Sequence, residues 1–356
     1  MDEICICNDG NDDECEQSYL FIPAAWIIFT QFLLAAECAI VNIIVIVIFL
    51  RPKNRTPSTI LLSALAATDC LTAMLASIPY FVTYVFHYDE LEVDEDSYFG
   101  GWFWPELYSR CIVFTPLSTI SFGFHTISVC LTVMLNIQKV VAIHFPLWTM
   151  LHVGNKSTVS VIFLIFVVVV SFFAWVTVTD NGTLFKGEGD ACCYEDPLNA
   201  NNIEGFNTVV NIFLIVAVLV VILCTAYICL KLLTVGKNIQ RTRNPIAQGK
   251  TRRSALIVVI LSVVFILSEL LSISKTINQS RLVPFVPIIE MINDSFILVS
   301  WQIGFSFNFV IYLIMSGNLR NTLKTFFVSL FQCKKETQLQ NTTSWASISN
   351  NTSTHI

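Results

Sequence analysis

A carboxylate at the centre of an apolar segment is the feature of this chain that most needs a chemical explanation. Asp69 lies within residues 57–86, which are otherwise uncharged. A carboxyl group among apolar side chains needs a proton, a cation or hydrogen-bond donors to offset its burial, and such groups in membrane proteins are usually functional. We expect this carboxylate to hold water or a sodium ion, and no other cofactor, with three polar residues around it: Asn42, Ser128 and Asn308.

Three further carboxylates, together with an acidic stretch at residues 87–110, predict where a cationic ligand binds. Carboxylates beside a low-dielectric surface concentrate the electric field and speed the capture of cations. A basic or arginine-containing peptide with an amidated, uncharged C-terminus would suit this arrangement, although the acidic stretch can equally be solvated outer surface. The candidate ligand-binding residues are Trp102, His125, Glu269, Glu290 and Asp294.

Glu269 lies deep in an apolar segment and needs a partner of its own. It can bind a ligand cation or hydrogen-bond to His125. No second histidine lies at metal-ligand spacing from His125, so we expect a packing residue and not a metal ligand. No two of the five histidines form a helical i, i+4 pair, which argues against metal-dependent hydrolysis within the membrane. A transporter would show repeated halves, which this chain lacks.

Seven apolar stretches must position these side chains. A hydrocarbon core about 30 Å thick requires about 20 helical residues, and each stretch is at least that long. Backbone amides in lipid must bond within their own segment, so each stretch should be a helix, and continuously apolar runs exclude a transmembrane β-barrel. The sequence predicts an all-α membrane protein, a seven-transmembrane helix bundle followed by a short amphipathic helix. The predicted spans are residues 24–50, 57–86, 111–143, 157–179, 208–234, 254–276 and 287–315.

Composition leaves room for little besides this membrane domain. The chain is 54% hydrophobic and 13% charged, whereas soluble domains average about 25% charged residues. The net charge of -6 and the lack of a basic stripe argue against nucleic acid as a partner and leave the lipid bilayer. The predicted organisation is an acidic extracellular tail, a transmembrane domain, an amphipathic juxtamembrane helix and a disordered cytoplasmic tail, at residues 1–23, 24–315, 316–333 and 334–356.

Charge asymmetry predicts the orientation in the membrane. Most lysines and arginines lie at the exits of odd-numbered spans, whereas residues 1–23 carry none. Because basic residues stay in the cytoplasm, we expect a multi-pass plasma-membrane protein with its N-terminus outside the cell and its C-terminus in the cytoplasm. On the outer side, Cys111 can form a disulfide with Cys193 or Cys192, although these cysteines can also be free or pair otherwise. Asn181 begins an Asn-Gly-Thr triplet and is a candidate glycosylation site.

The predicted cytoplasmic end carries its own candidates. In residues 316–333, leucine and phenylalanine recur at helical spacing with basic residues between them, which is typical of a helix lying on the inner leaflet. Cys333 precedes two lysines and is a candidate palmitoylation site. The tail at 334–356 is rich in serine and threonine, which predicts phosphorylation sites for arrestin docking.

Two motifs carry a family resemblance. The run from Arg55 to Asp69 resembles the second-helix signature of rhodopsin-like (class A) G-protein-coupled receptors. The run from Asn308 to Tyr312 is similar to their seventh-helix Asn-Pro-x-x-Tyr motif, with Phe309 in place of proline. A closer similarity, to invertebrate neuropeptide receptors of the myoinhibitory-peptide, sex-peptide, myosuppressin and FMRFamide-related group, is carried by residues 76–80, 124–133 and 308–316.

The resemblance implies a cell-surface receptor that transmits the binding of an extracellular neuropeptide to a heterotrimeric G protein by rearranging its helix bundle. It also implies a set of switch residues, namely Asp69, Asn308, Tyr312 and Lys139. The residues expected to couple to the G protein are Gln138, Lys139, Arg241, Arg243, Arg252 and Arg253.

Two departures from the family pattern leave a second hypothesis open. Gln138, Lys139 and Val140 stand where these receptors usually carry Asp-Arg-Tyr. Lysine offers one ammonium group where arginine offers a planar fork. Span 254–276 lacks the usual proline, which predicts a straighter helix with a weaker hinge. The alternative function is a decoy, a receptor that binds its ligand but signals weakly or not at all.

Overall fold

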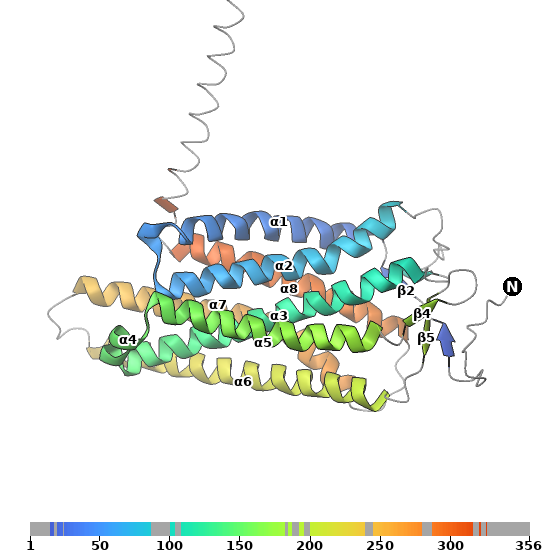
Figure 1. Ribbon diagram of the computed structural model, residues 1–356. Helices are drawn as coiled ribbons and strands as arrows, with labels where there is room; N and C mark the ends of the chain where they lie inside the picture. The colour runs from blue at the N-terminus through green and yellow to red at the C-terminus, as the bar shows by residue number, and fades with distance from the viewer. Residues whose placement is uncertain are drawn as a thin grey trace, which may run out of the picture. The chain divides into compact units, whose positions relative to one another are not determined.

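The chain folds into a bundle of long helices with short strands at one end (Figure 1). Residues 1–309 form one compact unit and residues 310–356 a second. The computed structural model describes residues 15–17, 20–23, 25–86, 100–103, 108–181, 184–186, 192–195, 200–238, 245–279, 287–315, 320–321 and 325.

Seven long helices coincide with the seven predicted spans, and the predicted helix bundle is confirmed. Six of them are long and apolar enough to cross a membrane, and the described part of the last contributes a shorter apolar segment, Ser295–Ile311. A short helix, α4 (Pro146–His152), and a 3-10 turn, η1 (Pro52–Asn54), lie between long helices. The long helices are α1 (Ala25–Phe49), α2 (Pro57–Phe86), α3 (Tyr108–His144), α5 (Asn155–Asn181), α6 (Ala200–Asn238), α7 (Pro245–Gln279) and α8 (Pro287–Met315).

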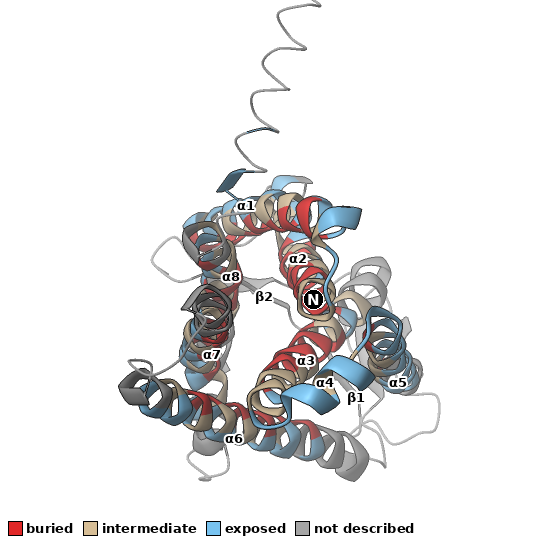
Figure 2. Ribbon diagram, turned by 90° about the vertical axis from the view of Figure 1, so that its left-hand side faces the viewer, coloured by how far each residue is buried: buried red, intermediate tan, exposed pale blue. Residues whose placement is uncertain are grey.

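The helix α3 is the central element of the bundle. It contacts α2, α5, α6 and α7, while α1 and α2 pack along each other. Figure 2 looks along the bundle and shows the buried residues turned inward and the exposed residues turned outward. Polar side chains that these helices carry into the bundle therefore lie close to polar groups of neighbouring helices, away from lipid.

The helix α5 packs on the outside of α3 and turns most of its apolar side chains outward (Figure 2). Its buried residue Phe173 lies over Gly123 of α3, where a Cβ atom would be only 3.1 Å from Cγ of the ring. Small residues at such crossings let membrane helices approach closely. The remaining apolar surface of α5 is suited to contact with lipid.

The long helices differ in whether they contain a proline in their interior. The helices α2 and α3 contain Pro79 and Pro116. By contrast, α7 runs for 35 residues with its only proline, Pro245, at the first position, where proline removes no helical hydrogen bond. The helix expected to hinge in this type of bundle therefore has no proline at which to kink.

Five short strands, which the sequence analysis did not anticipate, lie at one end of the bundle (Figure 1). One sheet has the order β1 (Cys15–Gln17), β5 (Cys192–Glu195), β4 (Leu184–Lys186), all antiparallel. In the other, β2 (Leu20–Pro23) pairs with β3 (Gly100–Phe103). Beyond the spans, the backbone groups of these connecting segments bond to one another instead of within a helix. We call this end of the bundle the strand end and the opposite end, which carries α4, the α4 end.

Candidate functional site

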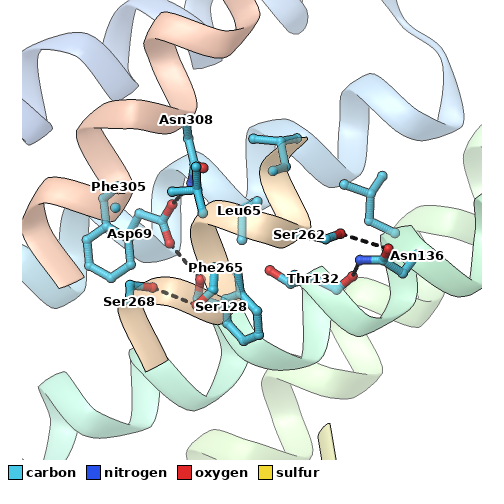
Figure 3. Close-up of a pocket in the computed structure, with 14 residues that line it drawn as sticks. Leu65, Asp69, Ser128, Thr132, Asn136, Ser262, Phe265, Ser268, Phe305 and Asn308 are labelled. Carbon is cyan, nitrogen blue, oxygen red and sulfur yellow. Dashed lines mark hydrogen bonds between the residues drawn. The ribbon is translucent and has the colours of Figure 1, made fainter. Parts of the chain in front are cut away.

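Asp69 is fully enclosed and holds three helices together. Its Oδ1 accepts a hydrogen bond from Ser128 Oγ of α3 at 2.6 Å. Its Oδ2 accepts one from Asn308 Nδ2 of α8 at 3.1 Å. Figure 3 shows both donors turned toward the carboxylate from opposite sides. Each carboxylate oxygen thus has a donor from another helix, which offsets the cost of burying it. We call these three residues the Asp69 cluster.

Asn42 was expected in this cluster, and the structure does not bond it to Asp69. Its side-chain Nδ2 donates to the backbone oxygen of Cys38 at 2.9 Å and lies 3.1 Å from the Cys38 Sγ. An amide one turn further along its own helix can reach that carbonyl without crossing to α2. The thiol of Cys38 lies 4.0 Å from the backbone oxygen of Asp69, so α1 approaches Asp69 through sulfur and not through the amide.

A small cavity, lined by both polar and apolar side chains, adjoins the Asp69 cluster. Its volume is about 20 Å³, and one water molecule needs about 10–15 Å³. The cavity extends between α3, α7 and α8, and hydroxyl groups of Ser128 and Ser268 lie on its wall (Figure 3). Gly304 also lines it, and a Cβ atom there would lie 3.2 Å from that of Ser268. A carboxylate and hydroxyl oxygens around a space of this size fit a single water or a small hard cation such as sodium.

The sequence analysis missed a second polar cluster, of which Asn136 and Ser262 line the far side of the same cavity (Figure 3). Oδ1 of Asn136 on α3 accepts a hydrogen bond from Ser262 Oγ of α7 at 2.9 Å and contacts Thr225 Oγ1 of α6 at 3.5 Å. Its Nδ2 donates to the Thr132 backbone oxygen at 2.9 Å. We call Asn136, Thr225 and Ser262 the Asn136 cluster. Asn136 is the only asparagine in span 111–143, and this isolated amide in an apolar span is the sequence feature that could have indicated the cluster.

At the α4 end, Lys139 and Gln138 of α3 both contact Ser58 in the first turn of α2. The Lys139 Nζ donates to Ser58 Oγ at 2.9 Å, and that hydroxyl lies 3.5 Å from the Gln138 Oε1. The two residues that replace the first members of the family triplet are therefore tied to α2. A second, unanticipated contact joins His144 Nδ1 of α3 to the Tyr227 hydroxyl of α6 at 2.8 Å.

Toward the strand end, His125 and Glu269 face each other from α3 and α7. Their Nε2 and Oε1 atoms are 3.3 Å apart, and neither residue is more than 2% exposed. The imidazole also stacks on the indole of Trp301 from α8, with ring centroids 3.7 Å apart. Of the two partners considered for Glu269, the structure places His125 beside it. Within the described residues, neither the ring nitrogens of His125 nor the Trp301 Nε1 makes a hydrogen bond, so His125 and Glu269 are in close contact without hydrogen-bond geometry.

The backbone positions of most other candidates are described without their side chains. Trp102 lies on β3 opposite Phe21 of β2. The helix α3 contacts β5, so the segments that carry Cys111 and the pair Cys192 and Cys193 lie side by side. On helices but with side chains outside the described set are Asn181, Arg252, Arg253, Glu290, Asp294 and Tyr312.

The remaining candidates fall outside the described residues. Arg241, Arg243 and Cys333 are among them. In the segment predicted to form an amphipathic helix, three residues are described, and each is helical and exposed: Arg320, Asn321 and Thr325. Those three residues agree with a helix there but do not reveal its apolar face.

Comparison with known proteins identifies the family of this helix bundle. The family model described as 7 transmembrane receptor (rhodopsin family) matches residues 41–279, which is more than half of the chain. A comparison with curated proteins found no match. The matched region contains α2, α3, α5, α6 and α7 in full and so includes every helix of the Asn136 cluster. Members of this family are receptors and not enzymes. The seven-helix bundle, its buried carboxylate on α2 and the family match together show that the chain is a multi-pass membrane receptor of the rhodopsin family.

Proposed function

We propose that this receptor lies in the plasma membrane with its N-terminus outside the cell, binds an extracellular neuropeptide, and transmits that binding to a heterotrimeric G protein. The observation that carries the proposal is the pair of buried polar clusters in the middle of the bundle, where one small cavity lies between the Asp69 cluster and the Asn136 cluster. Together these clusters link α2, α3, α6, α7 and α8, the elements that must move together if one end of a bundle reports on the other.

The strand end is the proposed ligand side. Glu290 and Asp294 lie in the first turns of α8, and the acidic residues of 87–110 precede α3. This negative field would speed the binding of a cationic peptide, and an amidated C-terminus would add no negative charge to that peptide. The likeness of residues 124–133 and 308–316 to invertebrate neuropeptide receptors supports the same class of ligand.

The α4 end is the proposed effector side. Lys139 and Gln138 are bonded to Ser58, and Arg252 and Arg253 lie near the start of α7. Separation of α7 from α3 would break the bond between Asn136 and Ser262 and open a cleft at this end. A helix of a G protein inserting in that cleft would favour the same arrangement that the peptide favours.

The C-terminal tail supplies the remaining proposed contacts at this side. The tail at 334–356 is rich in serine and threonine, and phosphorylation of those hydroxyls would add the negative charge that arrestin docking requires. Palmitoylation of Cys333 would anchor the start of the tail to the inner leaflet.

One observation favours the decoy alternative. Lys139 stands where the family carries arginine, and its ammonium group is bonded to Ser58. A single ammonium group cannot make the bidentate contacts of a guanidinium group. The signalling conformation of the helix bundle would therefore gain fewer hydrogen bonds from Lys139 than from an arginine. The absence of an internal proline from α7 acts in the same direction.

A peptide screen separates the two functions. Cells expressing the full chain would be exposed to amidated neuropeptides, with binding and G-protein activation measured on the same cells. The proposed function predicts at least one basic peptide that both binds and activates. A peptide that binds without activating any G protein identifies the decoy, and binding confined to acidic peptides would contradict the ligand class.

Loss of Asn308 should uncouple signalling from binding. The Asn308→Ala variant leaves one oxygen of Asp69 without its donor and loosens α8 from α2. With the peptide found by the screen, we expect signalling potency to fall about tenfold or more, within the usual range of allosteric coupling of about 1–3 kcal/mol, while affinity changes little. Ser63→Ala is the matched control, because that buried α2 hydroxyl bonds only within its own helix. An equal loss of affinity and potency would contradict a switch role.

Sodium is the proposed occupant of the cavity beside Asp69. The carboxylate and the Ser128 and Ser268 hydroxyls would offer it oxygen ligands, as hard cations prefer. We expect the unliganded receptor to unfold at a higher temperature in sodium than in choline chloride of equal ionic strength, because an ion that binds only the folded state stabilises it. The Asp69→Asn variant should lose this difference, whereas Ser63→Ala should keep it. Equal unfolding temperatures for the wild type in both salts would refute the site.

The pair of His125 and Glu269 is proposed as a tie between α3 and α7, beside the peptide and not in contact with it. A double-mutant cycle with Glu269→Gln and His125→Gln tests this, with thermal unfolding of the unliganded receptor as the readout. The two substitutions should be non-additive by about 0.5–3 kcal/mol, as for residues in direct contact. If Glu269→Gln abolished peptide binding while leaving the unfolding temperature unchanged, the carboxylate would belong to the ligand site instead.

A further inference from the structure

The short helix α4 exposes its apolar residues instead of burying them. Leu147, Met150 and Leu151 are 77%, 84% and 81% exposed, and half of Trp148 is exposed as well. Within α4, the least exposed residue is Thr149, which is polar. A helix that lay in water over the end of the bundle would show the opposite pattern.

The apolar residues of α4 share one side of the helix. Positions 147, 148, 150 and 151 follow the i, i+1, i+3, i+4 spacing that places side chains on a common face. Thr149 projects from the other side, and its hydroxyl donates to the backbone oxygen of Phe145 at 3.0 Å. An exposed apolar face of this kind marks contact with a membrane or with a partner protein.

The position of α4 favours the membrane. It begins two residues after α3 ends and precedes the start of α5 by only a few residues, and both neighbours are membrane spans. Figure 2 shows α4 in pale blue, lying across the ends of the long helices between α3 and α5. Val159 and Phe163 in the first part of α5 are exposed apolar residues as well. A helix that lies across the bundle where two spans emerge is at the depth of the lipid headgroups.

The charges around α4 favour an anionic lipid surface. Lys156, a few residues after α4, is exposed and positively charged, and two further exposed basic side chains, His144 before α4 and His152 at its last position, carry a charge only when protonated. The sequence contains no aspartate or glutamate between Glu106 and Asp180, so no carboxylate of this region opposes an anionic headgroup. Tryptophan is enriched at the boundary between headgroups and acyl chains, which suits Trp148.

We propose that α4 is an interfacial helix, whose face of Leu147, Trp148, Met150 and Leu151 inserts between the headgroups of an anionic leaflet. The membrane then supplies the apolar medium that this face lacks within the protein. Insertion would also hold the link between α3 and α5 in place. Lipid composition would then affect the contacts that Lys139 and His144 make with α2 and α6 at the α4 end of α3.

Quenching of Trp148 fluorescence tests this proposal with the full chain in lipid nanodiscs. The emission of Trp148 is obtained as the difference between the wild type and Trp148→Phe. In nanodiscs of phosphatidylcholine and phosphatidylserine brominated near the headgroup, we expect this emission to lose more than half of its intensity. Aqueous iodide should quench it less than the brominated lipid does. Trp175, which is exposed on span α5, provides the lipid-facing reference through Trp175→Phe.

A paired variant shows whether the apolar face is responsible. Leu147→Ser combined with Leu151→Ser should reduce quenching by brominated lipid and increase quenching by iodide, whereas Thr149→Ser, on the opposite side of α4, should behave as the wild type. The proposal is overturned if Trp148 of the wild type is open to iodide and untouched by brominated lipid. Shielding of Trp148 that appears only when a G-protein heterotrimer is added would also overturn it, and would assign the face to a protein partner.

Discussion

The requirement that polar groups inside the bilayer satisfy one another is the constraint on which this structure depends. Water is absent from the hydrocarbon core, so a buried carboxylate or amide is stabilised by partners within the protein, on a neighbouring helix or on its own. Asp69 meets this requirement through α3 and α8 at once. Its position therefore restricts the rotation and depth of three helices, and neither α3 nor α8 can turn without leaving a carboxylate oxygen unpaired.

The same constraint applies along one face of α3, which carries several of the polar residues inside the bundle. His125, Ser128, Asn136 and Lys139 follow one another at intervals of three to eight residues, and Thr132 fills the longest gap. Intervals of three and four place side chains on a common helical face. Each of these positions contacts a neighbouring helix: His125 contacts α7, Ser128 contacts α2, Asn136 contacts α6 and α7, and Lys139 contacts the start of α2. Because α3 carries these contacts over about 21 Å at about 1.5 Å per residue, it is the element through which the two ends of the bundle can influence each other.

The polar contacts along this face of α3 differ in the kind of partner that they involve. Asp69 has both oxygens bonded and lies beside a cavity with room for one small occupant. Lys139, by contrast, holds a serine hydroxyl, which is a weaker partner than a carboxylate.

The sequence alone determined the seven spans and the need of Asp69 for polar partners, because both follow from local properties. Span length and continuous hydropathy are read within one segment, and a lone carboxylate in such a segment is conspicuous. Which polar residues meet was decided only by the tertiary structure. Asn42 bonds to its own helix although its type suited the cluster, Glu269 lies against His125, and Asn136 joins two helices that no motif connected to it. The reason is physical: pairing depends on the rotation and depth of each helix against its neighbours, and those are set by packing between segments far apart in sequence.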